Sequence, residues 1–133
     1  FYGYVVIDVP ALVSNLTGHK AKDWLAADRS LAAQVAARLV RLVATVSPGA
    51  KRGSTAPYGY ATTLLVEAGD RQPRSLAEAF RRPVAATAEA AEAAMARHLQ
   101  AFDASYATGE ARRFLSLRND AALPGATRHT LPE

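Results

Sequence analysis

Apolar residues recur at helical spacing through residues 31–46, and the repeat stops shortly before a proline. The positions on one face are Leu31, Val35, Leu39, Leu42 and Val46. Asp28 or Ser30 can cap the start, and Pro48 keeps the residue before it out of the helical conformation. The pattern predicts an amphipathic helix of about four turns.

Two segments on either side of this helix have the β-branched and aromatic content of strands, residues 1–9 and residues 61–67. Pro10 would end the first strand because it removes a backbone donor from the ladder. The second strand has the length and composition of a buried one. The order is strand, helix, strand, and with the helices expected further along the chain we interpret the fold as α+β.

The second half of the chain is predicted to be mainly helical. Residues 75–78 match a capping box, so we expect a short helix that ends near Arg82. A longer helix is expected within the alanine-rich residues 84–106, and Gly109 is a natural stop. The apolar stripe of this longer helix consists of Ala91, Met95, Leu99, Phe102 and Tyr106.

Residues 113–117 are expected to add a small strand, and residues 119–133 show little periodicity and are expected to be irregular. We interpret the 133 residues as one domain fragment with three parts. These are a strand–helix–strand part (1–67), a helical extension with a short strand (68–118) and an irregular tail (119–133).

The composition narrows the functional classes. The chain carries a net charge of +4 at pH 7 and contains no cysteine. A basic balance favours a polyanionic partner. The lack of thiols excludes disulfides and thiolate metal sites, which fits the cytoplasm. No apolar run approaches the roughly 20 residues of a membrane span, so we expect no membrane partner.

Residue patterns that suggest catalysis are sparse. His19, His98 and His129 stand in three unrelated contexts, without the spacing of metal ligands. We interpret His98 as a packing or surface residue of its helix, and the other two as solvated loop residues. The sequence predicts neither an enzyme nor a bound metal or cofactor.

Residues 47–60 form a loop punctuated by glycine and proline, between the predicted helix and the second strand. Lys51 and Arg52 supply charge, the glycines let backbone amides approach a ligand, and Tyr58 and Tyr60 offer flat faces for stacking. Such a loop can hold a phosphate backbone. It is not a P-loop, because a strand and not a helix follows the basic residues. Its composition alone is equally compatible with a solvated turn.

Four short segments keep a characteristic order and approximate spacing. They are Phe1-Tyr2 with Tyr4, Ala44-Thr45 at the helix end, Pro48-Gly49-Ala50-Lys51, and Ser75-Leu76-Ala77 with Ala79-Phe80. Together they resemble the CasC family, the backbone subunit of Cascade in type I-E CRISPR systems and part of the repeat-associated RNA-binding superfamily. The resemblance covers roughly residues 1–84, and an insertion around residues 19–27 departs from it.

The resemblance implies a fold, a role and partners. The fold would be the C-terminal half of a modified RNA-recognition (ferredoxin-like) fold, with a central neighbouring strand supplied from outside this sequence. The role would be that of a non-catalytic scaffold in antiviral defence. Several copies would coat a CRISPR guide RNA and, with other Cascade subunits, present it for pairing with target DNA.

The resemblance and the chemistry of the loop together assign the RNA contacts. The expected RNA-binding residues are Gly49, Ala50, Lys51, Arg52, Gly53, Ser54 and Thr55. The two cations would bind phosphates, the glycines and alanine would approach the RNA through their backbone, and the hydroxyls would form hydrogen bonds. Lys51 is the residue whose RNA-binding role the resemblance implies most directly.

A second basic group surrounds the capping box and consists of Arg71, Arg74, Arg81 and Arg82. Arg81 and Arg82 are candidates for secondary nucleic-acid contacts, although a solvated charged surface explains the group equally well. A rival interpretation is a small-molecule enzyme fragment that binds a phosphorylated substrate through the loop, with catalytic residues outside this sequence. A third is an interaction module that binds neither ligand.

Overall fold

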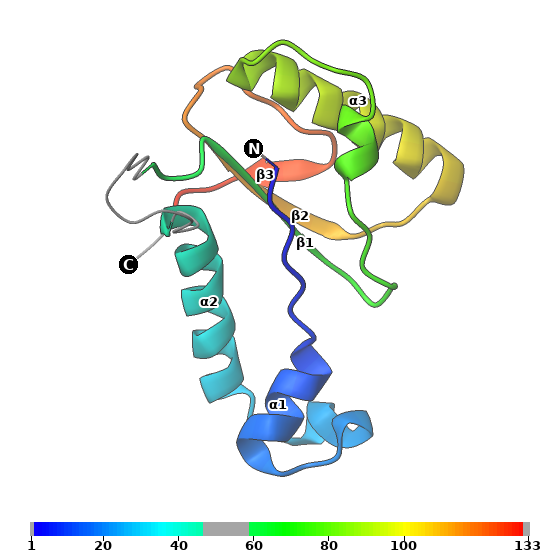
Figure 1. Cartoon of the computed structure of the whole chain (residues 1–133). Coiled ribbons are helices and arrows are strands. Elements are labelled where there is room, and N and C mark those ends of the chain that lie inside the picture. The colour runs from blue at the N-terminus through cyan, green and yellow to red at the C-terminus, as the bar shows by residue number, and fades with distance from the viewer. Residues whose placement is uncertain (1, 47–58, 132–133) are drawn as a thin grey trace. The chain divides into compact units, whose positions relative to one another are not determined.

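A computed structural model describes residues 2–46 and 59–131. In these ranges, residues 3–46 and 59–60 belong to one compact unit, and Tyr2 with residues 61–131 belongs to another. The elements (Figure 1) are α1 (Val9–Thr17), η1 (Ala21–Ala26), α2 (Ser30–Thr45), β1 (Thr63–Ala68), η2 (Ala77–Phe80), α3 (Ala88–Tyr106), β2 (Ala111–Ser116) and β3 (Ala126–Arg128). The chain is therefore α+β, as the sequence predicts.

Helix α1 begins inside the segment that was expected to be the first strand. The Asp8 carboxylate accepts a hydrogen bond from the backbone N–H of Ala11 at 2.9 Å. Pro10 stands in the first turn, where its fixed φ suits a helix and its missing N–H is not needed. The helix ends at Gly18, whose φ of 76° lies in the left-handed region that glycine adopts readily.

Residues 2–8 do not form a strand, so the prediction for residues 1–9 is wrong over the part that the structure describes. A strand needs a neighbour that pairs with its backbone groups, and none of the strands in the described ranges pairs with this segment. Tyr2 is held through its side chain. Its hydroxyl accepts a hydrogen bond from the Leu76 N–H at 2.9 Å, and its ring packs on Phe80 at a centroid distance of 5.5 Å.

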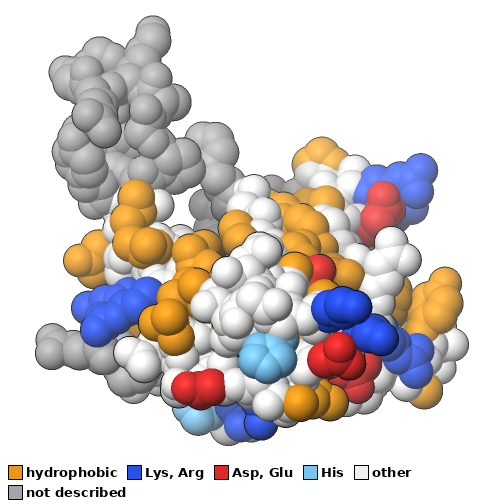
Figure 2. Space-filling model, turned by 90° about the horizontal axis from the view of Figure 1, so that it is seen from below, with side chains coloured by type: hydrophobic (Ala, Val, Ile, Leu, Met, Phe, Trp, Pro, Cys, Tyr) orange, Lys and Arg blue, Asp and Glu red, His pale blue; other side chains and the backbone are white. Residues whose placement is uncertain are grey.

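Helix α2 confirms the predicted amphipathic helix. Asp28 Oδ1 accepts a hydrogen bond from the Ser30 N–H at 2.9 Å and so satisfies a donor of the first turn. Several large apolar residues of its predicted stripe remain exposed, including Leu31, Leu42 and Val46. Figure 2, which views the molecule from below, shows that apolar side chains (orange) also reach the surface on that side.

The unit that contains α1 and α2 has a small core. Its buried members are Val13, Ala27 and Ala32, with Leu12 and Trp24 packed against them. Because two of the three buried residues are alanines, little apolar area is removed from water here. The core explains how α1, η1 and α2 are held together, whereas the exposed stripe of α2 plays no part in it.

The other unit contains a three-stranded sheet in the order β1-β2-β3. Strand β1 is antiparallel to β2, and β3 is parallel to β2. Strands β1 and β2 confirm the predicted strands at residues 61–67 and 113–117. Strand β3 corrects the prediction of an irregular tail, since its three residues pair with β2 from Arg112 to Phe114.

Helix α3 covers one face of this sheet (Figure 1) and confirms the helix expected within residues 84–106. Its first turn is capped by Thr87, whose Oγ1 accepts the Ala90 N–H at 3.2 Å. The core between helix and sheet is formed by Leu76, Leu99, Phe114 and Leu123. Side chains alternate along a strand, so the residues two positions from Phe114 also face α3. These residues are Arg112 and Ser116, and both are buried.

The capping box predicted at residues 75–78 does not form as such, because η2, a single short helical turn, begins after Leu76 without a side-chain cap. Ser75 Oγ accepts the Ala77 N–H at 3.1 Å, and η2 ends at Phe80 where the sequence predicted an end near Arg82. The turn brings Leu76 into the core below α3. Arg81 and Arg82 follow directly after this helical turn.

Candidate nucleic-acid interface

The predicted RNA-binding residues lie outside the described residues. They are Gly49, Ala50, Lys51, Arg52, Gly53, Ser54 and Thr55. The elements that flank them along the chain are described, and both were predicted. Helix α2 ends at Thr45, and β1 begins at Thr63.

The proposed secondary contacts, Arg81 and Arg82, are both exposed. Arg81 Nη1 lies 3.7 Å from Glu78 Oε2, and both side chains are largely solvated. A surface pair of this kind contributes on the order of 0.5 kcal/mol. The guanidinium group of Arg81 can therefore leave Glu78 for a stronger anionic ligand at little cost.

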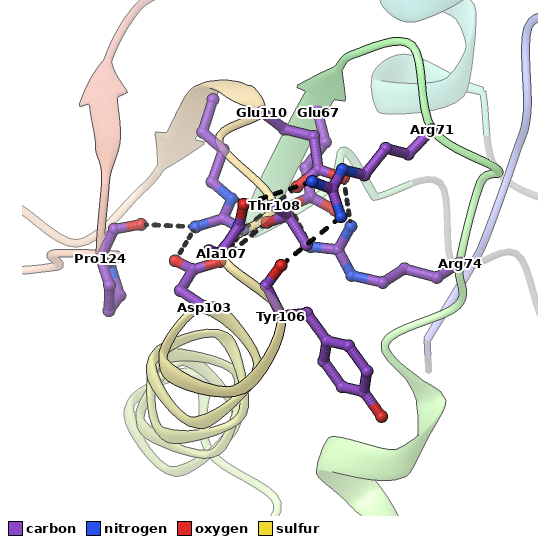
Figure 3. A network of polar contacts seen from close by, with 10 residues as sticks. Glu67, Arg71, Arg74, Asp103, Tyr106, Ala107, Thr108, Glu110 and Pro124 are labelled. Atoms are coloured by element: carbon purple, nitrogen blue, oxygen red, sulfur yellow. Dashed lines mark hydrogen bonds and ion pairs between the residues drawn. The ribbon is translucent and has the colours of Figure 1, made fainter.

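Arg74 differs from these two because it is held inside the protein (Figure 3). It donates from Nη2 to Glu67 at 2.9 Å and from Nη1 to Glu110 at 2.7 Å. Its guanidinium carbon lies 4.2 Å from the ring centroid of Phe102, which is a close cation–π contact. Arg74 thus has a packing role and is not a surface cation.

Arg112 pairs with the same two glutamates as Arg74, and the two arginines belong to one network of ion pairs, the ion network. The side chain of Arg112 is only 3% exposed. It donates from Nε to Glu67 at 2.6 Å and from Nη2 to Asp103 Oδ1 at 2.7 Å, and Nη1 is also hydrogen-bonded to Asp103. Glu110 lies 3.6 Å from Nη2. Three carboxylates, from β1, from α3 and from the residue just before β2, therefore converge on one buried guanidinium group, which explains how this charge is tolerated in the interior.

Arg71 fixes the end of α3. Its two terminal nitrogens each lie 3.4 Å from a backbone oxygen, one of Tyr106 and one of Ala107 (Figure 3). The last carbonyls of a helix have no partners within it and carry the negative end of the helix dipole. A cation at this position satisfies them, and Arg71 is itself exposed and has five N–H donors, more than these two contacts use.

The network is electrically balanced. Its positive members are Arg71, Arg74 and Arg112, and its negative members are Glu67, Asp103 and Glu110. The sum of these formal charges is zero. These six residues together therefore add nothing to the net positive charge of the chain, although three of them are arginines.

Two carboxylates of the network, Asp103 and Glu110, are stabilised in their ionised form. Hydrogen bonding from Arg112 is the main cause that lowers the pKa of Asp103, against the opposing effect of burial. Burial acts to raise the pKa of Glu110, but Thr108, Arg74 and Arg112 together outweigh it and lower this pKa as well. Hydrogen bonding to Asp103 in turn raises the pKa of Arg112. These directions keep Asp103, Glu110 and Arg112 charged at neutral pH.

Glu92 forms a second buried polar cluster, which the sequence did not reveal. Its Oε1 accepts hydrogen bonds from Thr63 and Ser116, both at 2.5 Å, and its Oε2 lies 3.4 Å from Nε of Arg118. The signal in the sequence was a glutamate next to Ala91, on the apolar side of the predicted helix. Because both carboxylate oxygens have partners, the cluster joins α3 to the sheet.

The histidines are dispersed. His19 and His129 are exposed, as predicted, and His98 packs near Phe102 at a centroid distance of 6.2 Å. Among the residues that the structure describes, no group of His, Cys, Asp and Glu is placed to hold a metal ion. None of the helices in the same ranges has both the length and the apolar character that a membrane crossing requires.

The model of one protein family matches the whole of the sequence. It is Cas_CT1975, described as CT1975-like protein, and the match extends over residues 1–133. No curated protein matches the chain. The family match includes the basic loop, the ion network and the end of α3.

Proposed function

The chain belongs to the CT1975-like family of CRISPR-associated proteins, and from this premise we propose that it is a guide-RNA-binding backbone subunit of Cascade, of the CasC type. It acts as a scaffold in the cytoplasm and catalyses no reaction. Its partners are the guide RNA, further copies of itself, other Cascade subunits and, through the guide, the target DNA.

One observation carries this proposal: the basic loop lies between two elements that form as predicted, in a chain matched throughout by a CRISPR-associated family. Lys51 and Arg52 bind phosphates of the guide, and the backbone at Gly49 and Gly53 approaches the ribose–phosphate chain. Contacts of this kind carry no sequence information. They leave the bases free to pair with DNA, which a subunit that accepts any guide requires.

The charge distribution of the described residues supports the same loop as the main electrostatic contact. Arg74 and Arg112 are occupied by internal carboxylates, so they add nothing to the attraction of RNA. Arg81 and Arg82 remain exposed and provide a secondary contact. We therefore assign the larger share of the salt-dependent affinity to Lys51 and Arg52.

The proposal is tested with the full-length protein carrying Lys51→Glu and Arg52→Glu, titrated with single-stranded guide RNA at several salt concentrations. Each lost phosphate contact is expected to reduce the slope of log affinity against log salt by roughly 0.7. The matched control is Lys20→Glu with Lys22→Glu. These two exposed lysines lie between α1 and α2, and their substitution changes the net charge by the same amount. An unchanged affinity and slope in the loop variant would refute the proposed contact.

A further inference from the structure

Three side chains form a stack at the end of α3. The guanidinium group of Arg74 lies over Phe102 at 4.2 Å, and the Phe102 and Tyr106 ring centroids are 4.5 Å apart with an interplanar angle of 32°. Tyr106 is the outermost member and is 62% exposed. One face of an aromatic ring is thus supported from within the protein while the residue remains largely open to solvent.

The ion network holds this stack in place from below. Arg74 cannot move away from Phe102 without breaking its hydrogen bonds to Glu67 and Glu110. Glu110 is itself fixed, because its side chain is only 7% exposed. The position of Phe102, and through it that of Tyr106, is therefore determined by a buried set of charged partners.

The backbone of Tyr106 is fixed as well, through Arg71 and the helix end. Arg71 contacts the carbonyl oxygens of Tyr106 and Ala107, and Ala107 closes the helix with a φ of 45°. Figure 3 shows the Tyr106 ring projecting away from the ion network. A ring whose backbone and inner face are both held loses little conformational entropy when a ligand stacks on it.

A hollow of about 130 Å³ lies beside the ring and is lined by residues that include Arg71, Phe102 and Tyr106. Sites for whole small-molecule ligands usually measure roughly 300 Å³ or more. This hollow therefore suits a single planar group at the edge of a larger molecule. Arg71 lines the same hollow, where its remaining N–H donors can meet an oxygen of that molecule.

We propose that Tyr106 is a stacking platform for one nucleobase of single-stranded RNA, with Arg71 at its edge to contact the ribose or phosphate of the same nucleotide. This inference rests on the proposed function for the identity of the ligand. An aromatic ring beside an arginine is the usual means by which proteins hold single-stranded bases without selecting among them. Because the Tyr106 ring is uncharged, its stacking contributes affinity without adding to the salt dependence.

The test has two parts and uses the full-length protein with a uridine-rich single-stranded RNA. First, Tyr106→Ala should lower the affinity roughly 5- to 150-fold, the range that base–aromatic stacking covers, while the salt slope stays unchanged. Tyr106→Trp should retain the affinity. Leu117→Ala is the control, since Leu117 is similarly exposed in the same unit, and it should have no effect.

Second, RNA carrying 5-iodouridine is irradiated in the complex, and the cross-linked residue is identified by mass spectrometry. A cross-link to Tyr106 supports the platform, because photocoupling requires the base and the ring to be in contact. If the wild-type protein binds RNA with the salt slope expected of the basic loop, but Tyr106→Ala binds equally well and no cross-link forms at Tyr106, the platform is refuted and the proposed function stands. If the wild-type protein does not bind RNA, both fail.

Discussion

Arg112 shows how a single side chain can link distant segments of this protein. It is buried, and it pairs with Glu67, Asp103 and Glu110, which lie on three different parts of the chain. A buried guanidinium group is tolerated only because its donors are occupied. Its substitution should therefore cost much more than the substitution of an arginine at the surface.

We expect Arg112→Met to lower the free energy of unfolding by about 3 to 5 kcal/mol, the usual result of removing one partner from a buried ion pair. Three carboxylates would lose a partner, and two of them are shielded from water. Urea denaturation measures the change. Arg81→Met is the control and should stay within about 0.5 kcal/mol. A loss for Arg112→Met no larger than that of the control would show that the network does not stabilise the fold.

Gly69 allows Glu110 to reach Arg74. A Cβ atom at position 69 would lie 2.8 Å from Cγ of Glu110, whose side chain is only 7% exposed and is held by Arg74. We expect Gly69→Ala to destabilise the protein by about 1 to 3 kcal/mol, as overpacking usually does. Gly3→Ala is the matched control, because a Cβ there meets nothing within 4 Å. Equal thermal unfolding midpoints for the two variants would contradict the argument.

At the level of elements, α3 owes its position to one fully buried residue. Leu99 has no exposed surface and packs with Leu76, Phe114 and Leu123. Leu99→Ala should lower the free energy of unfolding by about 2 to 5 kcal/mol, because it removes apolar contacts and leaves a cavity. Leu117→Ala deletes the same atoms at a site that is 70% exposed and should have little effect. Urea denaturation midpoints of the two variants test this prediction, and equal midpoints would contradict it.

The junction between α3 and β2 should also depend on pH. The pKa values of Asp103 and Glu110 are lowered on folding from ordinary values of 3.8 and 4.5. Their contribution to stability is therefore fully present above about pH 5 and is lost as the pH falls through the lowered values. Thermal unfolding between pH 6 and pH 2.5 should show this loss, and Asp103→Asn should show a shallower one. Identical pH profiles would contradict the role of Asp103.

The elements differ in how far their sequence could predict them. Helices α2 and α3 are local structures, with caps and periodic apolar residues that lie within one segment, so both were predicted. Strand β3 has three residues and exists because β2 is there to pair with it. Residues 2–8 show the converse, since their strand-like composition has no pairing neighbour among the described residues.

The candidate site could be predicted only as a set of residue types. The sequence identified Arg71 and Arg74 as basic, and placed Phe102 and Tyr106 on one stripe of a helix. It could not show that Arg74 and Glu110, which are 36 residues apart, form an ion pair. Partners this distant are brought together by the packing of the sheet and α3, which no local pattern encodes.

For the molecule as a whole, the distribution of charge matters more than its total. The three arginines of the ion network are balanced by three carboxylates, so the net charge of +4 belongs entirely to the rest of the chain. Lys51 and Arg52 lie in that remainder. We expect Arg81→Glu with Arg82→Glu to weaken RNA binding less than the double substitution in the loop, as measured by the salt slope of each variant. A larger effect of the substitutions at Arg81 and Arg82 would show that the main RNA contact lies just after η2 and not in the loop.

The central claim is that the protein binds guide RNA through its backbone, without selecting among bases, and leaves all but the stacked base available for pairing. The most direct measurement compares the affinities of the full-length protein for two single-stranded RNAs of equal length and composition but shuffled sequence, across salt concentrations. Our account predicts equal affinities and equal, clearly negative salt slopes. A strong preference for one sequence, or binding that does not respond to salt, would contradict it.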